Sequence, residues 1–173
     1  MTEYPWYADV RDDSLEQGDI FEMCPVFLPS EESLGGGPIG LDLVHRDVIV
    51  VSQSCDLVQG REKVKEVLLC AIWSLSELTD GLLATPKGRE ETRRGNVPGM
   101  HMIAASALLG MERALRVADF RVLHSLPVAF LRKLAVDHGK RLRLLPPYRE
   151  HLSQAFARYF MRVGLPVDIA PFK

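Results

Sequence analysis

The stretch that decides the fold is DVIVVSQSCD, residues 47–56. Its four consecutive β-branched residues, at 48–51, are typical of a strand that is buried on both faces. A second run of this kind, EVLLCAIWS, follows at residues 66–74. The residues between the two runs are polar and contain a glycine, which indicates a turn. We therefore expect the two strands to pair antiparallel.

Outward from this pair, the sequence predicts further short strands, two helices and two loops. Strands are expected at 15–21 with a continuation at 26–28, at 100–104 and at 118–123. A helix is expected at 126–135, with Pro127 near its first turn. The apolar stripe formed by Leu152, Ala155, Phe156, Tyr159, Phe160 and Val163 predicts a second helix that ends near Gly164. The Gly-rich stretch 29–38 and the charged stretch 86–95 are expected to be mobile loops.

These elements together predict an α+β, β-rich protein. Short strands and long β-rich connections favour a small, strongly bent sheet or barrel, with the C-terminal amphipathic helix packed on it. A chain of 173 residues is long enough for one domain. We expect a barrel-like body over residues 1–135 and a helical extension of the same domain over 136–173.

Composition excludes several classes of protein. Apolar residues make up 47% of the chain and charged residues 25%, which are globular averages and unlike a disordered or collagen-like chain. No apolar run approaches the roughly 20 residues of a membrane span, so no membrane partner is expected. The first residues lack the features of a signal peptide. The three cysteines, Cys24, Cys55 and Cys70, are then expected to be reduced thiols in a cytoplasmic protein.

The formal net charge of −2 hides a strong asymmetry along the chain. Residues 1–90 contain 17 acidic and 7 basic side chains, whereas residues 91–173 contain 6 acidic and 14 basic ones. One interpretation is self-complementary packing or head-to-tail assembly of the two halves. The other is a basic face that binds a polyanion. The sequence leaves both interpretations open.

The polar string after the first buried strand is a candidate for chemistry. Ser54, Cys55 and Asp56 follow directly on a rigid element, where catalytic groups can be held in place. Cys55 would be a nucleophile if a histidine lowered its pKa. The alternative is that the hydroxyls satisfy backbone groups in a turn and Cys55 is a small buried residue. The sequence does not indicate which of the histidines at 45, 101, 124, 138 and 151 lies nearby.

A second candidate centre is Arg46, immediately before the first buried strand. An arginine at that place can stabilise a phosphate or its transition state. RNA cleavage through the 2′-hydroxyl then needs only a base and an acid, and no metal. The chain has no CxxC, HxxxH or HExxH spacing, so neither a metal nor a cofactor is expected. Phosphate contacts are expected from Arg93, Arg94, Arg113, Arg116 and Arg121. On the last helix, Arg149, Arg158 and Arg162 form a solvated face or contact a partner.

The order of elements resembles that of the MazF/PemK-type toxins over roughly residues 15–135. QGDIF at 17–21 resembles their "R-G-D-I/V" strand, and RDVIVVS at 46–52 resembles their "R-P-V-V-V-I/L-S" strand. EVLLCAIWS at 66–74 is similar to "T-V-I-V-A-P-I-T-S", and VADFRVL at 117–123 resembles "Q-I-R-T-I-D". The string at 52–57 and the long tail from Leu145 lie outside the family pattern.

This resemblance implies a small SH3-like β-barrel that is usually dimeric. Family members cut single-stranded RNA without metal and are neutralised by an antitoxin segment. Their catalytic arginine carries over to Arg46, and Ser74 is the nearest hydroxyl to their catalytic Ser/Thr. Here Trp73 stands at or beside that place, and Asp47 replaces the proline after the arginine. Both departures favour a module that has lost the activity, because an adjacent acid weakens anion binding.

The sequence thus leaves two functional hypotheses from different classes. The first is a non-catalytic module on this barrel that binds a protein partner, or a second copy, in a bacterial toxin–antitoxin, stress or defence system. The alternative is a metal-independent single-stranded RNA endonuclease that uses Arg46 with Ser74, Ser54 or Asp56.

Overall fold

The computed structural model describes residues 4–29 and 40–161. The strands are β1 (Tyr7–Val10), β2 (Ile20–Pro29), β3 (Leu41–Val50), β4 (Glu66–Ser74), β5 (Met100–Ile103), β6 (Arg116–Pro127) and β7 (Arg141–Leu144). The helices are α1 (Pro86–Arg93), α2 (Val128–His138) and α3 (Tyr148–Phe160), with short 3-10 turns η2 (Ser54–Asp56) and η3 (Gly81–Ala84). The protein is therefore α+β and rich in strands, as expected.

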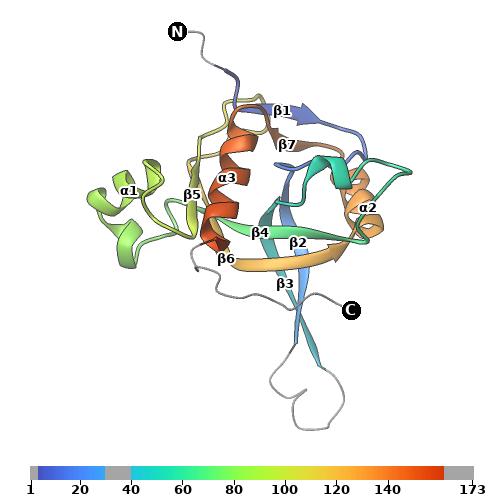
Figure 1. Cartoon of the computed structure of the whole chain (residues 1–173), viewed down its shortest axis with the longest axis horizontal. Helices are drawn as coiled ribbons and strands as arrows, with labels where there is room; N and C mark the ends of the chain where they lie inside the picture. The colour runs from blue at the N-terminus through green and yellow to red at the C-terminus, as the bar shows by residue number, and fades with distance from the viewer. Residues whose placement is uncertain (1–3, 30–39, 162–173) are drawn as a thin grey trace, which may run out of the picture.

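The strands form an antiparallel five-stranded sheet and a two-stranded sheet (Figure 1). The larger sheet has the order β2-β3-β4-β6-β5, and the smaller one pairs β1 with β7. The amide of Leu144 donates to the carbonyl of Gly18 over 3.0 Å, which joins β7 to the start of β2. On the other side, the Tyr7 hydroxyl donates to the carbonyl of Ala104, which follows β5, over 2.6 Å. Among the described residues no ladder joins β1 to β5, so the sheets curve without forming a closed barrel.

Two hydrophobic cores lie on opposite faces of the central strands β3 and β4. Ile49 and Cys70 contribute to one core, which also contains Leu152 of α3. Val48 and Leu69 contribute to the other, with Leu131 of α2. This alternation confirms that the runs at 47–51 and 66–74 are buried on both faces, and they pair antiparallel as predicted. Figure 1 shows the two helices on different sides of the sheet.

Helix α1 corrects one prediction, because the charged stretch 86–95 is not a loop. Pro86 occupies the first helical position, and the amide of Gly88 donates to the Thr85 hydroxyl oxygen over 3.0 Å. This cap satisfies one of the amides that a helix start leaves free. A Thr-Pro helix start was therefore present in the sequence, and the charges around it obscured it.

Strands β1 and β7 were not predicted at all. The sequence of β7 is RLRL, and its two arginines indicate an exposed segment by composition alone. All four residues are buried in the structure because the arginines pair with carboxylates inside the protein. The predicted C-terminal helix, which Pro146 and Pro147 lead into, begins at Tyr148. Its last predicted residues and Gly164 lie outside the described residues, as does most of the Gly-rich stretch.

The outer parts of β2 and β3 leave the body together as a two-stranded arm, residues 24–29 paired with 41–46 (Figure 1). β3 has 10 residues but pairs with β4 only from Val48 to Val50. An irregularity in β2, where Met23 has a φ of 51°, lies at the base of the arm. The arm thus continues β2 and β3 beyond the point where β3 stops pairing with β4.

Candidate functional site

The divergence of β3 from β4 opens a cavity of about 300 Å³, here called the notch. Arg46 and Ser74 both line it, so the structure brings together the pair that the resemblance implies. Arg113 and Arg116 line it as well, from the start of β6 and the segment before it. Acidic side chains, Asp47 and Glu77, share the same lining.

Arg46 is half-buried and held by aromatic groups. Its guanidinium carbon lies 5.8 Å from the ring centroid of Trp73, and Nη1 lies 3.4 Å from Nε2 of His124. Burial, reinforced by the positive charge of Arg46, lowers the pKa of His124. His124 is therefore neutral at pH 7 and accepts a hydrogen bond from the arginine. Within residues 4–29 and 40–161, Arg46 forms no ion pair with a carboxylate.

Ser74 shares the notch with Arg46, but its hydroxyl contacts another serine. The Ser74 and Ser76 hydroxyl oxygens lie 2.7 Å apart and share a hydrogen bond. No carboxylate or imidazole contacts the Ser74 hydroxyl in the described part of the chain. The arrangement therefore provides a cation and a hydroxyl in one cavity, without a base attached to that hydroxyl.

The other cations of the notch are compensated by one carboxylate. Arg113 donates two hydrogen bonds to the Glu22 carboxylate, from Nε over 2.6 Å and from Nη2 over 2.5 Å. Arg116 Nη1 lies 3.0 Å from the same carboxylate. Burial alone would raise the pKa of Glu22, but hydrogen bonds from Arg113 and the charges of both arginines lower it overall. Glu22 is thus ionised at neutral pH, and it offsets positive charge that a phosphate would otherwise meet.

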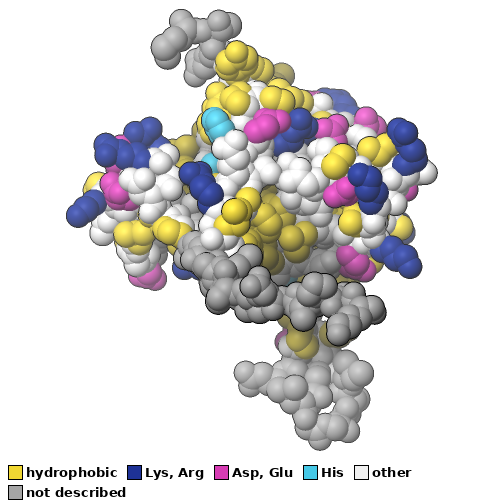
Figure 2. Space-filling view, viewed as in Figure 1, with side chains coloured by type: hydrophobic (Ala, Val, Ile, Leu, Met, Phe, Trp, Pro, Cys, Tyr) yellow, Lys and Arg dark blue, Asp and Glu magenta, His cyan; other side chains and the backbone are white. Residues whose placement is uncertain are grey.

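The remaining arginines considered for RNA contacts are paired too. Arg93, the last residue of α1, and Arg94, which caps the helix, each lie 2.7 Å from the carboxylate of Glu90. Arg121 lies 2.7 Å from Asp119. Figure 2 shows basic side chains in separate places, several of them beside acidic ones, on the face that carries α3. The described residues visible in this view therefore form no continuous basic patch.

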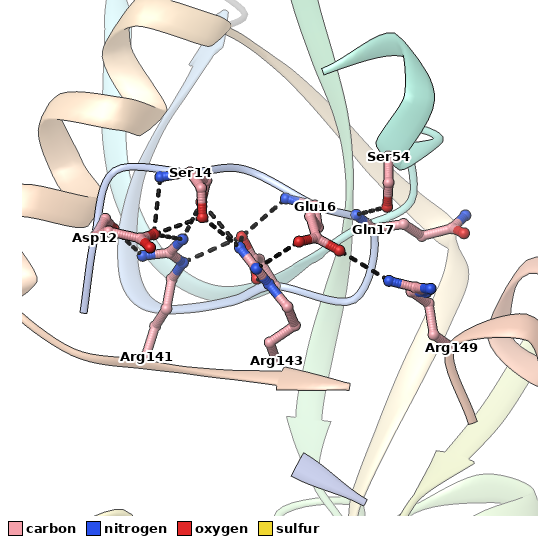
Figure 3. Close-up of polar contacts among 9 residues, drawn as sticks. Asp12, Ser14, Glu16, Gln17, Ser54, Arg141, Arg143 and Arg149 are labelled. Carbon is pink, nitrogen blue, oxygen red and sulfur yellow. Dashed lines mark hydrogen bonds and ion pairs between the residues drawn. The ribbon is translucent and has the colours of Figure 1, made fainter. Parts of the chain in front are cut away.

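The string Ser54–Asp56 lies away from the notch, in η2, and shares no lining residue with it. The Ser54 hydroxyl oxygen accepts the amide of Gln17 over 3.0 Å (Figure 3). Cys55 is exposed, with its sulfur 3.6 Å from the Asp56 carboxylate, and Asp56 pairs with Lys63. No histidine lines either hollow beside Cys55 among the described residues. The structure thus separates these candidates from Arg46 and Ser74, and places no histidine in the described hollows beside Cys55.

A buried ion network that sequence reasoning missed lies beside η2 (Figure 3). The carboxylate of Asp19 is fully buried between Arg143, whose Nη2 lies 2.9 Å away, and Arg141, whose Nε lies 3.1 Å away. Glu16 then joins Arg143 to Arg149, at 2.8 and 2.9 Å. The signal in the sequence was the charge asymmetry, because the acids come from the first half of the chain and the arginines from the second. Arg149 is thereby engaged inside the molecule, Arg158 is exposed, and Arg162 lies outside the described residues.

Comparison of the chain with known protein families, curated proteins and solved structures finds no match. Nothing in those comparisons identifies a relationship to the MazF/PemK-type toxins. In the described residues, no helix is long and apolar enough to cross a membrane. The same residues contain no cluster of three or more metal-binding side chains.

Proposed function

We propose that this chain is a protein-binding module and that the arm is its docking element. The observation that carries the proposal is the pairing of its cations. Arg93, Arg94, Arg113, Arg116 and Arg121 each have a carboxylate partner within the molecule. Affinity for a nucleic acid comes mainly from cations that neutralise phosphates. Three carboxylates, Glu90, Glu22 and Asp119, offset part of the charge of these five arginines and so reduce the affinity that they can contribute.

The arm supplies what a protein partner recognises. Phe27, Leu41 and Leu43 are 52%, 59% and 52% exposed. Phe27 is directly opposite Leu43 in the β2–β3 ladder, so the two side chains share a face with Leu41. Exposed apolar side chains that lie next to one another are more typical of an interaction surface than of the rest of a protein surface. A bacterial toxin–antitoxin, stress or defence system is the setting that the resemblance favours.

The proposal is tested by capturing partners from the source cell with immobilised protein. The double variant Phe27→Asp/Leu43→Asp is compared with the wild type and with Leu109→Asp, since Leu109 is another exposed apolar residue that lies outside the arm. We expect the wild type and Leu109→Asp to retain the same partner. The arm variant should lose it while its melting temperature stays close to that of the wild type.

Two results would overturn the proposal. One is retention of every partner by the arm variant. The other is the absence of any stable partner for the wild type, together with monomeric behaviour in solution. A second copy of the chain is one of the possible partners, and the oligomeric state of the arm variant would then change.

A second candidate is a metal-independent RNA endonuclease, and one observation favours it. Arg46 and Ser74 line the same notch, as an RNA-cleaving site of this type would require. Arg46 would stabilise the phosphorane, and Ser74 or a neighbouring carboxylate would orient the 2′-hydroxyl. The acids of the notch and the lack of a base on Ser74 weigh against this candidate.

The test of the second candidate is incubation with a long single-stranded RNA in EDTA. Cleavage that disappears in Arg46→Ala would establish the endonuclease and displace the binding module as the main function. Intact RNA with both proteins, and no growth arrest on expression, would exclude it.

A further inference from the structure

The part of β3 in the arm has a free strand edge. Val50 exchanges backbone hydrogen bonds with Gly18 and Asp19, on the β2 side, whereas the amide of Val51 donates to Leu68, on the β4 side. Backbone groups alternate in direction along a strand, so odd-numbered residues of β3 point toward the β4 side. The ladder with β4 ends at Val48. In the described part of the chain, residues 41–47 have no strand on that side.

The opposite edge of the arm is blocked by prolines. In β2, Pro25 lies opposite His45 and Pro29 opposite Leu41. The missing amides of both prolines would point away from β3, because the backbone groups of His45 and Leu41 also point away from β2. Proline at such positions is a common way to prevent an edge strand from pairing. β3 has no proline between residues 41 and 50, so its edge retains every donor.

The side chains along this edge define what fits it. Leu41 and Leu43 are exposed on one face of β3. An added strand with apolar side chains at alternate positions would pack against them. Arg46 projects from the other face and has no carboxylate partner in the described residues. A half-buried guanidinium is best complemented by a carboxylate, which can accept two parallel hydrogen bonds.

We propose that an extended segment of a protein partner adds to the sheet as a strand along residues 41–47 of β3. Its alternate apolar side chains cover Leu41 and Leu43, and one of its carboxylates binds Arg46. This inference rests on the proposed protein-binding function and gives it a partner class. Strand addition derives its affinity from main-chain hydrogen bonds and its specificity from alternate side chains.

The first experiment selects binders from a phage-displayed library of random 12-residue peptides on immobilised wild-type protein. The enriched sequences should alternate apolar and other residues and should carry an acidic residue. His45→Pro removes one outward amide of the free edge and no ladder bond with β2. We expect this variant to bind the best peptide with at least tenfold lower affinity. The matched control, His45→Ala, should bind it with the affinity of the wild type.

The second experiment does not depend on how His45→Pro folds. Two copies of the best peptide are N-methylated at alternate residues, one at the odd and one at the even positions. Each copy lacks the amide donors along one edge of its strand. Only the copy that lacks the donors facing β3 should lose binding. Arg46→Gln should remove the preference for the acidic peptide relative to its amide counterpart. Equal binding of both N-methylated peptides, or an undiminished acidic preference in Arg46→Gln, would overturn the inference.

These outcomes separate the inference from the proposed function. Partner capture that needs Phe27 and Leu43 but is unchanged in a folded His45→Pro variant would leave the module intact and refute strand addition. Failure of the library to yield any peptide above the uncoated control would also refute strand addition by short segments.

Discussion

At the scale of single residues, Asp19 is the centre of the buried ion network beside η2. Its carboxylate is fully buried and contacts Arg141 and Arg143, both of which are almost fully buried themselves. Removing one member of a buried ion pair leaves the other charge without compensation, which costs more than the pair itself contributes. Asp19 therefore holds β7 against the start of β2.

We predict that Asp19→Asn lowers the free energy of unfolding by about 3–5 kcal/mol. The reason is that two buried guanidinium groups lose their shared counter-charge. Asp9→Asn is the matched control, since Asp9 forms an exposed pair with Arg11 and should cost less than about 1 kcal/mol. Urea unfolding of the three proteins at pH 7 measures the difference. Equal stability of the two variants would show that the network is not structural.

His101 gives a prediction for pH dependence. Burial, together with the charges of His151 and Arg158 on α3, lowers its pKa to about 4. The unfolded chain therefore binds a proton at higher pH than the folded one. The contribution of neutral His101 to the free energy of unfolding is fully present above about pH 6.5. It is lost progressively as the pH falls toward 4.

The expected loss from His101 between pH 7 and pH 5 is about 2 kcal/mol. Urea unfolding at these two pH values measures it. In His101→Leu, which has no titrating group at this position, the loss should be smaller by that amount. An identical pH dependence in the variant and the wild type would contradict the assignment.

At the scale of elements, the sequence predicted strands in the regions of all five strands of the larger sheet and missed the two strands of the smaller one. The inner end of β3 and most of β4 are apolar runs, and apolar runs rich in β-branched residues favour a buried strand. β7 could not be found, because RLRL becomes a buried strand only after Asp19 and Glu16 arrive from another part of the chain. The candidate site was also predictable only in part. The predicted pairing of the two central strands brings Arg46 and Ser74 close together. The ion pair between Arg113 and Glu22, in contrast, depends on contacts between distant segments of the chain.

Helix α1 depends on close packing against η3. A Cβ atom on Gly88 would lie 1.9 Å from the carbonyl oxygen of Leu82, which is a contact that the backbone must shift to avoid. We predict that Gly88→Ala increases amide hydrogen exchange throughout α1, whereas Lys87→Ala, an exposed neighbour, leaves it unchanged. The exchange of β3 and β4 should be the same in both variants, because local unfolding is confined to such a unit. Protection of α1 that survives in Gly88→Ala would refute this account of its packing.

At the scale of the whole molecule, the charge asymmetry of the sequence is resolved by folding. Acids of the first half, Glu16, Asp19 and Glu22, pair with arginines of the second half, Arg113, Arg116, Arg141, Arg143 and Arg149. Self-complementary packing therefore explains much of the asymmetry without a polyanion. The arm keeps exposed apolar side chains and a free strand edge, and Arg46 at its base has no carboxylate partner in the described residues.

The most direct test of protein binding through the arm is amide hydrogen exchange of the chain alone and in the captured complex. The amides of Leu41, Leu43, His45 and Asp47 point away from β2, so they should exchange quickly in the free protein. In the complex we predict that these amides become protected, while those of α1 do not change. Protection confined to α3, or an arm whose exchange is the same in both states, would contradict the account.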